Sequence, residues 1–483
     1  MPTRPALGQL RLFAGLTLVL LAISAPLNYS FDGGQMLAAA QSFVGHGDID
    51  VPCTTATFPR ADGRCFGIFY LLQSVALVPF VALGQLLGAL LGLPGAYASA
   101  ATAMVLPALV TAASATLIAA LARERGAGSR DALLAALAFV FGTELLTISR
   151  TLFAEPLGAA CLALCAWGLL APPGDRRRHA LAALAAALVV MTKPQLLFAA
   201  PLAGLALALV DRRVRPAILA LAGTFAGSLA VLGYNWYRFG DPTDFGGSSR
   251  KLYVGGSPDG SSPIVELLDG AAQLLVSPNH GLLVFGPVAL LGLVGLMRRP
   301  LDRVAAVCLG GALGVFGFAL FEPNGNFWGT RYLVPLLPLA CVGVAALGRR
   351  GRWVAIMLVV ATAVSQAPNL VSYPERLRFE TGAPLPQAWD VGRLTVVDVW
   401  PSALHQLRAA SRTDPASLVK GADPAVTDEF FRVVAQWWWM LPAVGIPAIL
   451  GAGVSLLVLV AGGWLVVQSV RPRAPVATGA RSG

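Results

Sequence analysis

Residues 97–130 read YASAATAMVLPALVTAASATLIAALARERGAGSR, with no charged residue before Arg123. An apolar run of about 20 residues crosses the ~30 Å hydrocarbon core of a bilayer as a helix. Similar runs recur from Leu12 to Val470 in a 483-residue chain that is 56% hydrophobic and 12% charged. Ordinary globular proteins are about 25% charged. The sequence therefore predicts an all-α polytopic membrane protein and excludes soluble enzymes, disordered proteins and secreted disulfide scaffolds.

The net charge of +10 comes from short arginine clusters between the apolar runs. Such clusters mark cytoplasmic loops under the positive-inside rule. No aromatic residues alternate with them to stack on bases, so the charge does not indicate a nucleic-acid partner. The clusters are Arg123/Arg125/Arg130, Arg176/Arg177/Arg178, Arg212/Arg213/Arg215, Arg298/Arg299/Arg303, Arg349/Arg350/Arg352 and Arg471/Arg473.

Residues 66–93 are the ambiguous apolar stretch. If they span the membrane, the Arg123 cluster and all later clusters move to the outside. Gln73, Pro79 and Gln85 suit an interfacial or re-entrant helix better than a lipid-facing one. We therefore expect about 12 transmembrane helices, or 13 if residues 66–93 span, with both termini cytoplasmic. The expected spans are residues 12–27, 97–122, 132–149, 154–170, 180–191, 196–210, 217–234, 282–296, 304–321, 332–347, 353–367 and 437–467.

The long polar segments all fall on the external side in this arrangement. Residues 28–94 form a large first loop with interfacial helices, and residues 235–281 form a central loop. Loops longer than about 15 residues are usually functional. Residues 1–366 then make the main transmembrane region, residues 367–436 an external segment of unassigned role, and residues 437–483 the last span and cytoplasmic tail.

Two cysteines, Cys53 and Cys65, lie outside the apolar runs and share the first external loop. An oxidising compartment would allow them to form a disulfide; two free thiols close together by chance are the alternative. The other four cysteines lie in apolar helices and are expected to be small packing residues. No cysteine or histidine spacing resembles a zinc site.

Charged residues at membrane depth cost ~2.5–3.5 kcal/mol each on insertion scales and are usually functional. In the predicted topology they gather at the external ends of the helices, whereas Glu144, inside an apolar run, is expected to make a helix-packing contact. Snorkelling and loop salt bridges are the alternative explanation for each of the others. The external set is Asp32, Arg150, Glu155, Lys193, Arg238, His280, Glu322 and Arg331.

Several of these residues lie in segments that resemble a known family. The stretch NYSFDGGQMLAAAQSFVGHGDIDV (28–51) resembles the first external loop of GT-C membrane glycosyltransferases. SRTLFAEP (149–156), MTKPQLL (191–197), NWYRFGDPTDFG (235–246) and GTRYLVPLLPL (329–339) resemble later segments of the same family. The nearest branch is that of the polyprenyl-phosphate-mannose protein mannosyltransferases and the aminoarabinose transferases of lipid A.

The resemblance covers roughly residues 12–347, with one departure. Many relatives carry an Asp-Glu pair in the first loop, whereas Gly33 follows Asp32 here. A second carboxylate role would then fall to Glu155 or Asp48. The resemblance implies that residues 1–366 are a catalytic region that transfers a sugar to an acceptor hydroxyl at the extracytoplasmic face, with inversion.

The short cytoplasmic loops agree with this expectation, because they cannot fold a nucleotide-sugar domain. There is no P-loop and no Rossmann glycine fingerprint. The donor is then a polyprenyl-phosphate sugar, whose phosphate Arg150, Lys193 and Arg331 would bind. Asp32 is the candidate general base. Glu155 is the second catalytic candidate, since a double displacement would need a nucleophilic carboxylate. Arg238, His280 and Glu322 are further candidates for substrate binding.

The expected partners are membrane lipid, the lipid-phosphate donor and a glycan, lipid or protein acceptor, at the plasma membrane. The motifs imply no cofactor, and participation of a divalent metal stays open. A transporter or flippase of lipid-linked sugars is the alternative, although that class would favour ionisable residues near the midplane and matching half-repeats. A non-enzymatic scaffold would tolerate replacement of Asp32, Arg150 and Lys193.

Overall fold

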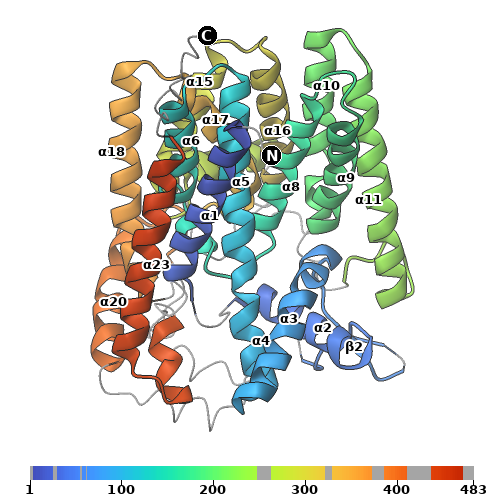
Figure 1. Cartoon of the computed structure of the whole chain (residues 1–483). Coiled ribbons are helices and arrows are strands. Elements are labelled where there is room, and N and C mark those ends of the chain that lie inside the picture. Colours follow the sequence, from blue (N-terminus) through green and yellow to red (C-terminus); the bar gives the residue numbers. More distant parts are fainter. Residues whose placement is uncertain are drawn as a thin grey trace, which may run out of the picture.

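The computed structural model describes residues 4–25, 30–54, 57–60, 62–246, 263–320, 329–372, 386–410 and 437–470. These residues form helices and one short β-hairpin (Figure 1). The elements are α1 (Arg4–Ala22), α2 (Phe31–His46), β1 (Phe58–Pro59), β2 (Cys65–Phe66), α3 (Leu71–Leu91), α4 (Gly95–Ala103), α5 (Val105–Glu124), α6 (Ser129–Phe141), α7 (Leu145–Ile148), α8 (Glu155–Leu169), α9 (Arg176–Thr192), η1 (Pro194–Leu196), α10 (Ala199–Asp211), α11 (Arg215–Phe239), α13 (Pro263–Val276), α14 (Leu282–Phe285), α15 (Pro287–Met297), α16 (Arg303–Ala319), η2 (Arg331–Leu336), α17 (Leu337–Val342), η3 (Gly343–Ala346), α18 (Arg349–Gln366), η4 (Ala367–Leu370), α20 (Thr395–Ala410), η5 (Trp437–Val444) and α23 (Ala448–Gln468).

The helices have the length and composition that a bilayer requires. In the described part of the chain, six are long and apolar enough to cross a membrane, and the α4–α5 pair counts as one of them, over Gly95–Glu124. Shorter apolar helices, such as Glu155–Leu169, complete the bundle. The chain is thus an all-α polytopic membrane protein, as the sequence predicts. The number of spans stays a prediction.

The arginine clusters of the described residues meet at one end of the bundle, which we call the arginine end; Arg471 and Arg473 fall outside the described residues. Ion pairs there join connections that are far apart in the sequence. Each pair links an arginine of one connection to an acidic residue of another. The pairs are Arg125–Asp302 at 2.5 Å, Arg178–Glu124 at 2.8 Å, Arg303–Asp211 at 2.8 Å and Arg352–Asp131 at 2.8 Å. This common location is what the positive-inside rule predicts for loops on one side of a membrane.

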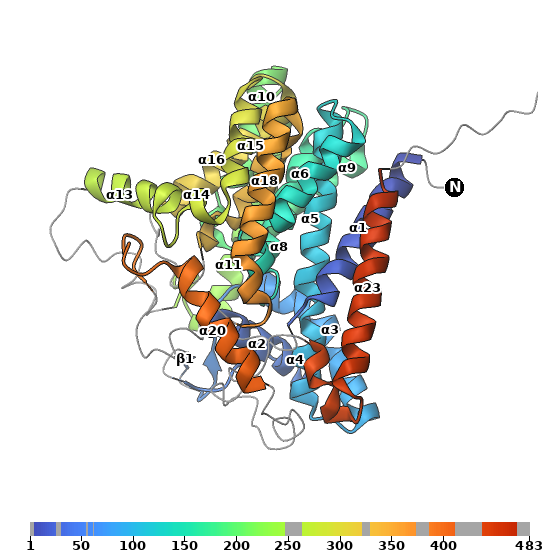
Figure 2. The ribbon, with the colours of Figure 1, turned by 90° about the vertical axis from the view of Figure 1, so that its left-hand side faces the viewer.

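The ambiguous stretch forms α3, which turns back along α4 as a helical hairpin (Figures 1 and 2). Thr102 donates a hydrogen bond to the carbonyl of Phe80 at 2.7 Å, and Ser99 donates one to that of Val81 at 3.3 Å. A Cβ at Gly84 would lie 2.3 Å from Thr102 Oγ1, so only glycine allows this approach. The chain therefore reaches the arginine end through α5, and α3 does not carry it there.

The first loop lies at the opposite end, which we call the pocket end. Here α2 is followed by the β1–β2 hairpin, in which Phe58 pairs with Phe66. A disulfide joins Cys53 to Cys65, with their Cα atoms 5.2 Å apart. The other four cysteines are buried free thiols. The disulfide and hairpin give a compact shape to a loop that has little regular structure of its own.

Candidate active site

A cavity at the pocket end brings together residues from five segments of the chain. Its volume is about 500 Å³, including the space at its open mouth. The segments are α2, the turn before α3, the start of α8, the α9–η1 junction and η2. The residues that line the cavity are Asp32, Met36, Ile68, Phe69, Tyr70, Ala154, Glu155, Lys193, Gln195, Arg331 and Tyr332.

Both carboxylates of the cavity lie in the first turn of a helix, where the helix dipole favours negative charge. Asp32 lies in the first turn of α2, and the capping residue Ser30 accepts a hydrogen bond from Gly33 N at 3.2 Å. Glu155 begins α8, and Pro156, whose fixed φ suits a first helical turn, follows it. The Asp32 side chain is 19% exposed and that of Glu155 is 1% exposed. Asp32 is therefore the carboxylate that a substrate can reach more easily.

Lys193 enters the cavity because α9 ends at this residue. Pro194 disfavours the helical conformation in the residue before it, and Lys193 is extended, with φ −152° and ψ 112°. Its Nζ lies 2.6 Å from Glu155 Oε1 and 4.5 Å from the centre of the Tyr332 ring. The T-K-P segment thus places a cation directly against a buried carboxylate.

Arg331 connects the two carboxylates. Its Nη2 lies 2.9 Å from Asp32 Oδ2, and its Nε lies 3.1 Å from Glu155 Oε1. The guanidinium also lies 4.4 Å from the centre of the Phe153 ring. We call Asp32, Glu155, Lys193 and Arg331 the pocket cluster. Its two cations and two anions balance, so the cluster carries no net formal charge when all four are ionised.

The segment before Arg331 is held by Glu144. Thr330 donates a hydrogen bond from its hydroxyl to Glu144 Oε1 at 3.1 Å. Gly329 has φ +67°, and a Cβ there would lie 1.9 Å from Glu144 Oε2. Glu144 is fully buried. The sequence predicts a packing contact for Glu144. In the structure, Glu144 contacts the backbone segment that precedes Arg331.

Arg150 does not line the cavity, contrary to its predicted phosphate-binding role. The side chain is buried, and it donates hydrogen bonds to the carbonyls of Ile23, at 2.8 Å, and Asn369. The guanidinium of Arg150 therefore connects the residues that follow α1 to the segment that follows α18. The SRT motif correctly located the turn, but the guanidinium points into the protein interior.

Two of the three further candidates for substrate binding, Arg238 and His280, also lie outside the cavity lining. Arg238 is buried and binds backbone carbonyls of the first loop. His280 lies in the α13–α14 connection, where burial lowers its pKa and favours the neutral imidazole. Glu322 falls outside the described residues.

Sequence reasoning missed the uncharged lining residues. Gln195 and Tyr332 lie in the same segments as Lys193 and Arg331, MTKPQLL and GTRYLVPLLPL, so the sequence already placed them near these cations. Ile68, Phe69 and Tyr70 belong to the ambiguous apolar stretch, which gave no signal for a site. Within the described ranges, no group of three or more His, Cys, Asp or Glu residues is arranged to hold a metal ion.

Comparisons with known proteins give similarity to solved structures only. No family model and no curated protein matches the chain. ArnT from Cupriavidus metallidurans bound to undecaprenyl phosphate is 14% identical, with a TM-score of 0.49 over 95% of this chain and 77% of that one. Its apo state is 13% identical, with the same TM-score and coverage.

An archaeal structure was also found, the Archaeoglobus fulgidus oligosaccharyltransferase in its apo form. It is 14% identical, with a TM-score of 0.38 over 88% of this chain and 59% of that one. The function proposed next rests on the pocket of this chain and its position in the bundle.

Proposed function

We propose that the protein is an integral membrane glycosyltransferase that moves a sugar from a polyprenyl-phosphate donor to an acceptor hydroxyl. The observation that carries this proposal is the pocket cluster, in which two carboxylates and two cations from four segments line one cavity. Such a set supplies the two functions the reaction needs, a base for the acceptor and cations for the phosphate. The donor, the acceptor hydroxyl and the inverting outcome are all parts of the proposal.

The depth of the cavity favours a substrate carried by lipid. Helix α8 has 15 residues and α9 has 17, and each runs between the arginine end and the cavity. At about 1.5 Å per residue, these helices cover roughly 22–26 Å. That falls only a few Å short of the ~30 Å hydrocarbon core, so in this proposal the cavity opens near the boundary between hydrocarbon and water in the far leaflet. A phosphate attached to a polyprenyl chain lies at that boundary, with the chain in the hydrocarbon.

Lys193 and Arg331 are the proposed phosphate ligands. Lys193 offers a compact charge with three donors, and Arg331 offers a planar set of donors that matches phosphate oxygens. In the structure both cations are paired with carboxylates. A donor phosphate therefore competes with Asp32 for Arg331, and its binding releases Asp32 toward the acceptor. The cations then stabilise the charge that grows on the departing phosphate.

Asp32 is the proposed general base. The acceptor oxygen attacks the anomeric carbon, its proton passes to Asp32, and the bond between the anomeric carbon and the phosphate oxygen breaks. Glu155 contacts both Lys193 and Arg331 and is almost fully buried. We assign Glu155 to holding these cations, because a nucleophile would have to leave both of them. A single displacement of this kind inverts the anomeric carbon.

The proposal is tested by supplying the purified full-length protein with radiolabelled undecaprenyl-phosphate sugars. We expect cleavage of one donor and transfer of its sugar to a membrane-extract acceptor, with Asp32→Asn inactive. Movement of intact labelled lipid across a liposome bilayer, without cleavage of any donor, would instead establish a transporter.

Orientation is tested separately by cysteine labelling. We propose that the arginine end is cytoplasmic and that the cavity opens on the extracytoplasmic face of the plasma membrane. A cysteine placed in residues 126–128 of the α5–α6 connection should react with a membrane-impermeant reagent only from the cytoplasmic side. External labelling there would reverse the proposed orientation.

A further inference from the structure

One wall of the cavity has no regular secondary structure to fix its shape. Ile68, Phe69 and Tyr70 line the cavity and lie between β2 and α3. The segment contributes apolar surface and an aromatic hydroxyl, and Tyr70 Oη accepts a hydrogen bond from Gln195 Nε2 at 3.0 Å. We call residues 67–70 the pocket wall. Side chains from other elements therefore have to hold the backbone of the pocket wall in place.

Two side chains from different helices hold the backbone of the pocket wall. Arg238, in the last turn of α11, donates from Nη1 to the carbonyls of Gly67 at 2.5 Å and Phe69 at 2.8 Å. Gln35, on α2 and one turn after Asp32, accepts a hydrogen bond at Oε1 from Ile68 N at 3.2 Å. The wall is therefore tied to α11 and also to the helix that carries the proposed base.

The environment of Arg238 indicates that it serves the wall and binds no ligand. The residue has no exposed surface, and its Nη2 donates to Asn235 Oδ1 at 2.7 Å. The rings of Tyr234 and Phe239 lie 3.9 and 4.4 Å from the guanidinium carbon. A buried cation is expensive unless its donors are satisfied. Here the wall carbonyls accept from Nη1 and Asn235 accepts from Nη2, whereas Nε has no hydrogen-bond partner among the described residues.

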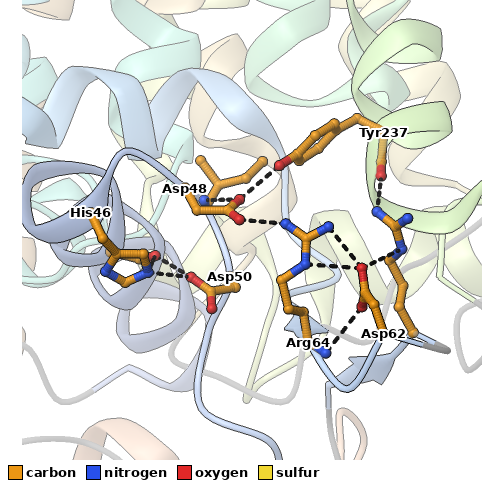
Figure 3. Close-up of polar contacts among 9 residues, drawn as sticks. His46, Asp48, Asp50, Asp62, Arg64 and Tyr237 are labelled. Carbon is orange, nitrogen blue, oxygen red and sulfur yellow. Dashed lines mark hydrogen bonds and ion pairs between the residues drawn. The ribbon is translucent and has the colours of Figure 1, made fainter.

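The neighbouring residue, Tyr237, holds the outer part of the same loop (Figure 3). Its hydroxyl donates to Asp48 Oδ1 at 2.7 Å, and Arg64 Nη1 donates to Asp48 Oδ2 at 2.5 Å. Arg60 Nη1 donates to the carbonyl of Tyr237 at 3.0 Å. The end of α11 thus contacts the loop through two consecutive residues, Tyr237 at the surface and Arg238 beneath it.

We propose that Arg238 is a positioning residue that fixes the pocket wall and thereby determines which sugar the cavity accepts. This proposal rests on the proposed glycosyl transfer for its choice of substrate. The role of Arg238 in holding the wall does not depend on which reaction the protein catalyses. A segment without regular secondary structure takes the shape that its side-chain partners impose. Loosening the wall changes the fit of the sugar while leaving the pocket cluster intact.

Two variants loosen the wall from different sides. Arg238→Lys keeps the charge, but a single ammonium cannot reproduce the guanidinium geometry that spans two carbonyls. Gly67→Ala leaves Arg238 unchanged, but its Cβ would lie 2.9 Å from Gln35 Oε1, the atom that accepts from Ile68 N. Asp50→Asn is the matched control, because Asp50 pairs with Ser42 and His46 within the first loop and does not contact α11.

The first measurement needs no substrate and is hydrogen exchange at residues 67–70 of the full-length protein in lipid nanodiscs. We expect about tenfold faster exchange in Arg238→Lys and in Gly67→Ala, because the Ile68 amide, which donates to Gln35, opens to solvent more often once either contact that holds the wall is weakened. Asp50→Asn should match the parent. Parental exchange in both wall variants would overturn the proposal, whatever the enzyme's activity.

The second measurement is turnover with several undecaprenyl-phosphate sugars. We expect KM to rise about tenfold and discrimination between sugars to narrow, with kcat changed less than about threefold. Asp32→Asn should show the opposite pattern, with a large fall in kcat and little change in KM. A fall in kcat at unchanged KM in both wall variants would overturn the positioning role. If no variant or parent turns over any donor while exchange responds as expected, the wall assignment stands and the proposed function fails.

Discussion

Two groups of acidic and basic side chains occur at the pocket end, and they differ in how they are assembled. The pocket cluster joins Asp32, Glu155, Lys193 and Arg331 from four segments that are far apart in the sequence. A second group, the loop cluster, occupies one short stretch of the first loop and borrows only Tyr237 from elsewhere (Figure 3). Its charged members are His46, Asp48, Asp50, Arg60, Asp62 and Arg64.

The two clusters differ most in the burial of Glu155, since Asp32 and Asp48 are equally exposed, at 19% each. Glu155 is 1% exposed, whereas Asp62 and Arg64 are 37% and 36% exposed and lie two residues apart. Exposed ion pairs contribute about 0–1 kcal/mol to stability. Removing one partner of a buried pair costs about 3–5 kcal/mol, because the other charge is left uncompensated. Acidic and basic residues thus stabilise the fold of the first loop in the loop cluster, and in the pocket cluster they are available for chemistry.

The contrast is tested most strongly at Asp32. Asp32→Asn keeps the size and polarity of the side chain but removes the proposed base. General-base catalysis contributes about 10²–10⁴-fold, so transfer should fall by that factor while undecaprenyl phosphate still binds. The assay is sugar release from a radiolabelled donor, with variants whose thermal midpoint matches the parent.

Glu155→Gln and Asp50→Asn are the comparisons for this variant. Asp50→Asn should retain most activity, because Asp50 does not line the cavity. Near-parental turnover in Asp32→Asn together with an inactive Glu155→Gln would assign the base to Glu155.

The next largest effect is expected in lipid-phosphate binding at Lys193. Lys193→Met should weaken binding of undecaprenyl phosphate by about 10- to 100-fold, because charge-assisted hydrogen bonds contribute about 1.5–3 kcal/mol. The measurement is equilibrium binding of fluorescent undecaprenyl phosphate. Arg64→Met, in the loop cluster, is the matched loss of a cation and should leave this affinity unchanged. Equal affinities in both variants would remove Lys193 from the proposed phosphate site.

Arg150 tests the same distinction between a substrate-binding and a structural role. Its SRT motif predicted phosphate binding, whereas its hydrogen bonds to the carbonyls of Ile23 and Asn369 indicate a structural role. Arg150→Met leaves the carbonyls of Ile23 and Asn369 without a donor, at a cost of about 1–3 kcal/mol. We expect a lower thermal midpoint and parental affinity for undecaprenyl phosphate. A loss of affinity without a change in the midpoint would return Arg150 to phosphate binding.

The smallest effect is expected in the pH response of the loop cluster. The hydrogen bond from Ser42, together with the proximity of His46, lowers the pKa of Asp50 below its ordinary value of 3.8. A lowered pKa means that the stabilisation is complete above the ordinary value and is lost as the pH falls through the folded-state value. Below about pH 4, proteolysis of the first loop should therefore quicken more in the parent than in Asp50→Asn. Asp48 and Asp62, whose pKa values are also lowered, lose their stabilising contacts in both proteins. The part due to Asp50 should be no more than ~1 kcal/mol of loop stability. A larger response in the variant would contradict this assignment.

The sequence by itself determined the class of the protein and the approximate positions of its apolar helices, although several helices begin or end some residues away from the expected spans. Apolar runs admit few structures in lipid, because every backbone polar group has to be satisfied internally. Arginine clusters identify a common end for the same reason that charges avoid the hydrocarbon core. Asp32, Glu155, Lys193 and Arg331 were also predictable, since each charge follows or precedes an apolar run at the other end.

Only the tertiary structure decided where similar charges point. Arg150, Arg238 and Arg331 all lie at the pocket end, yet only Arg331 enters the cavity. The partners of Arg150 are 127 and 219 residues away, and the Gly67 carbonyl bound by Arg238 is 171 residues away. Hydropathy likewise could not show that α3 packs along α4, because that packing depends on the close contact of Gly84 with α4. The direction of a buried guanidinium follows from which carbonyls or carboxylates other segments present to it, and that information is absent from its local sequence.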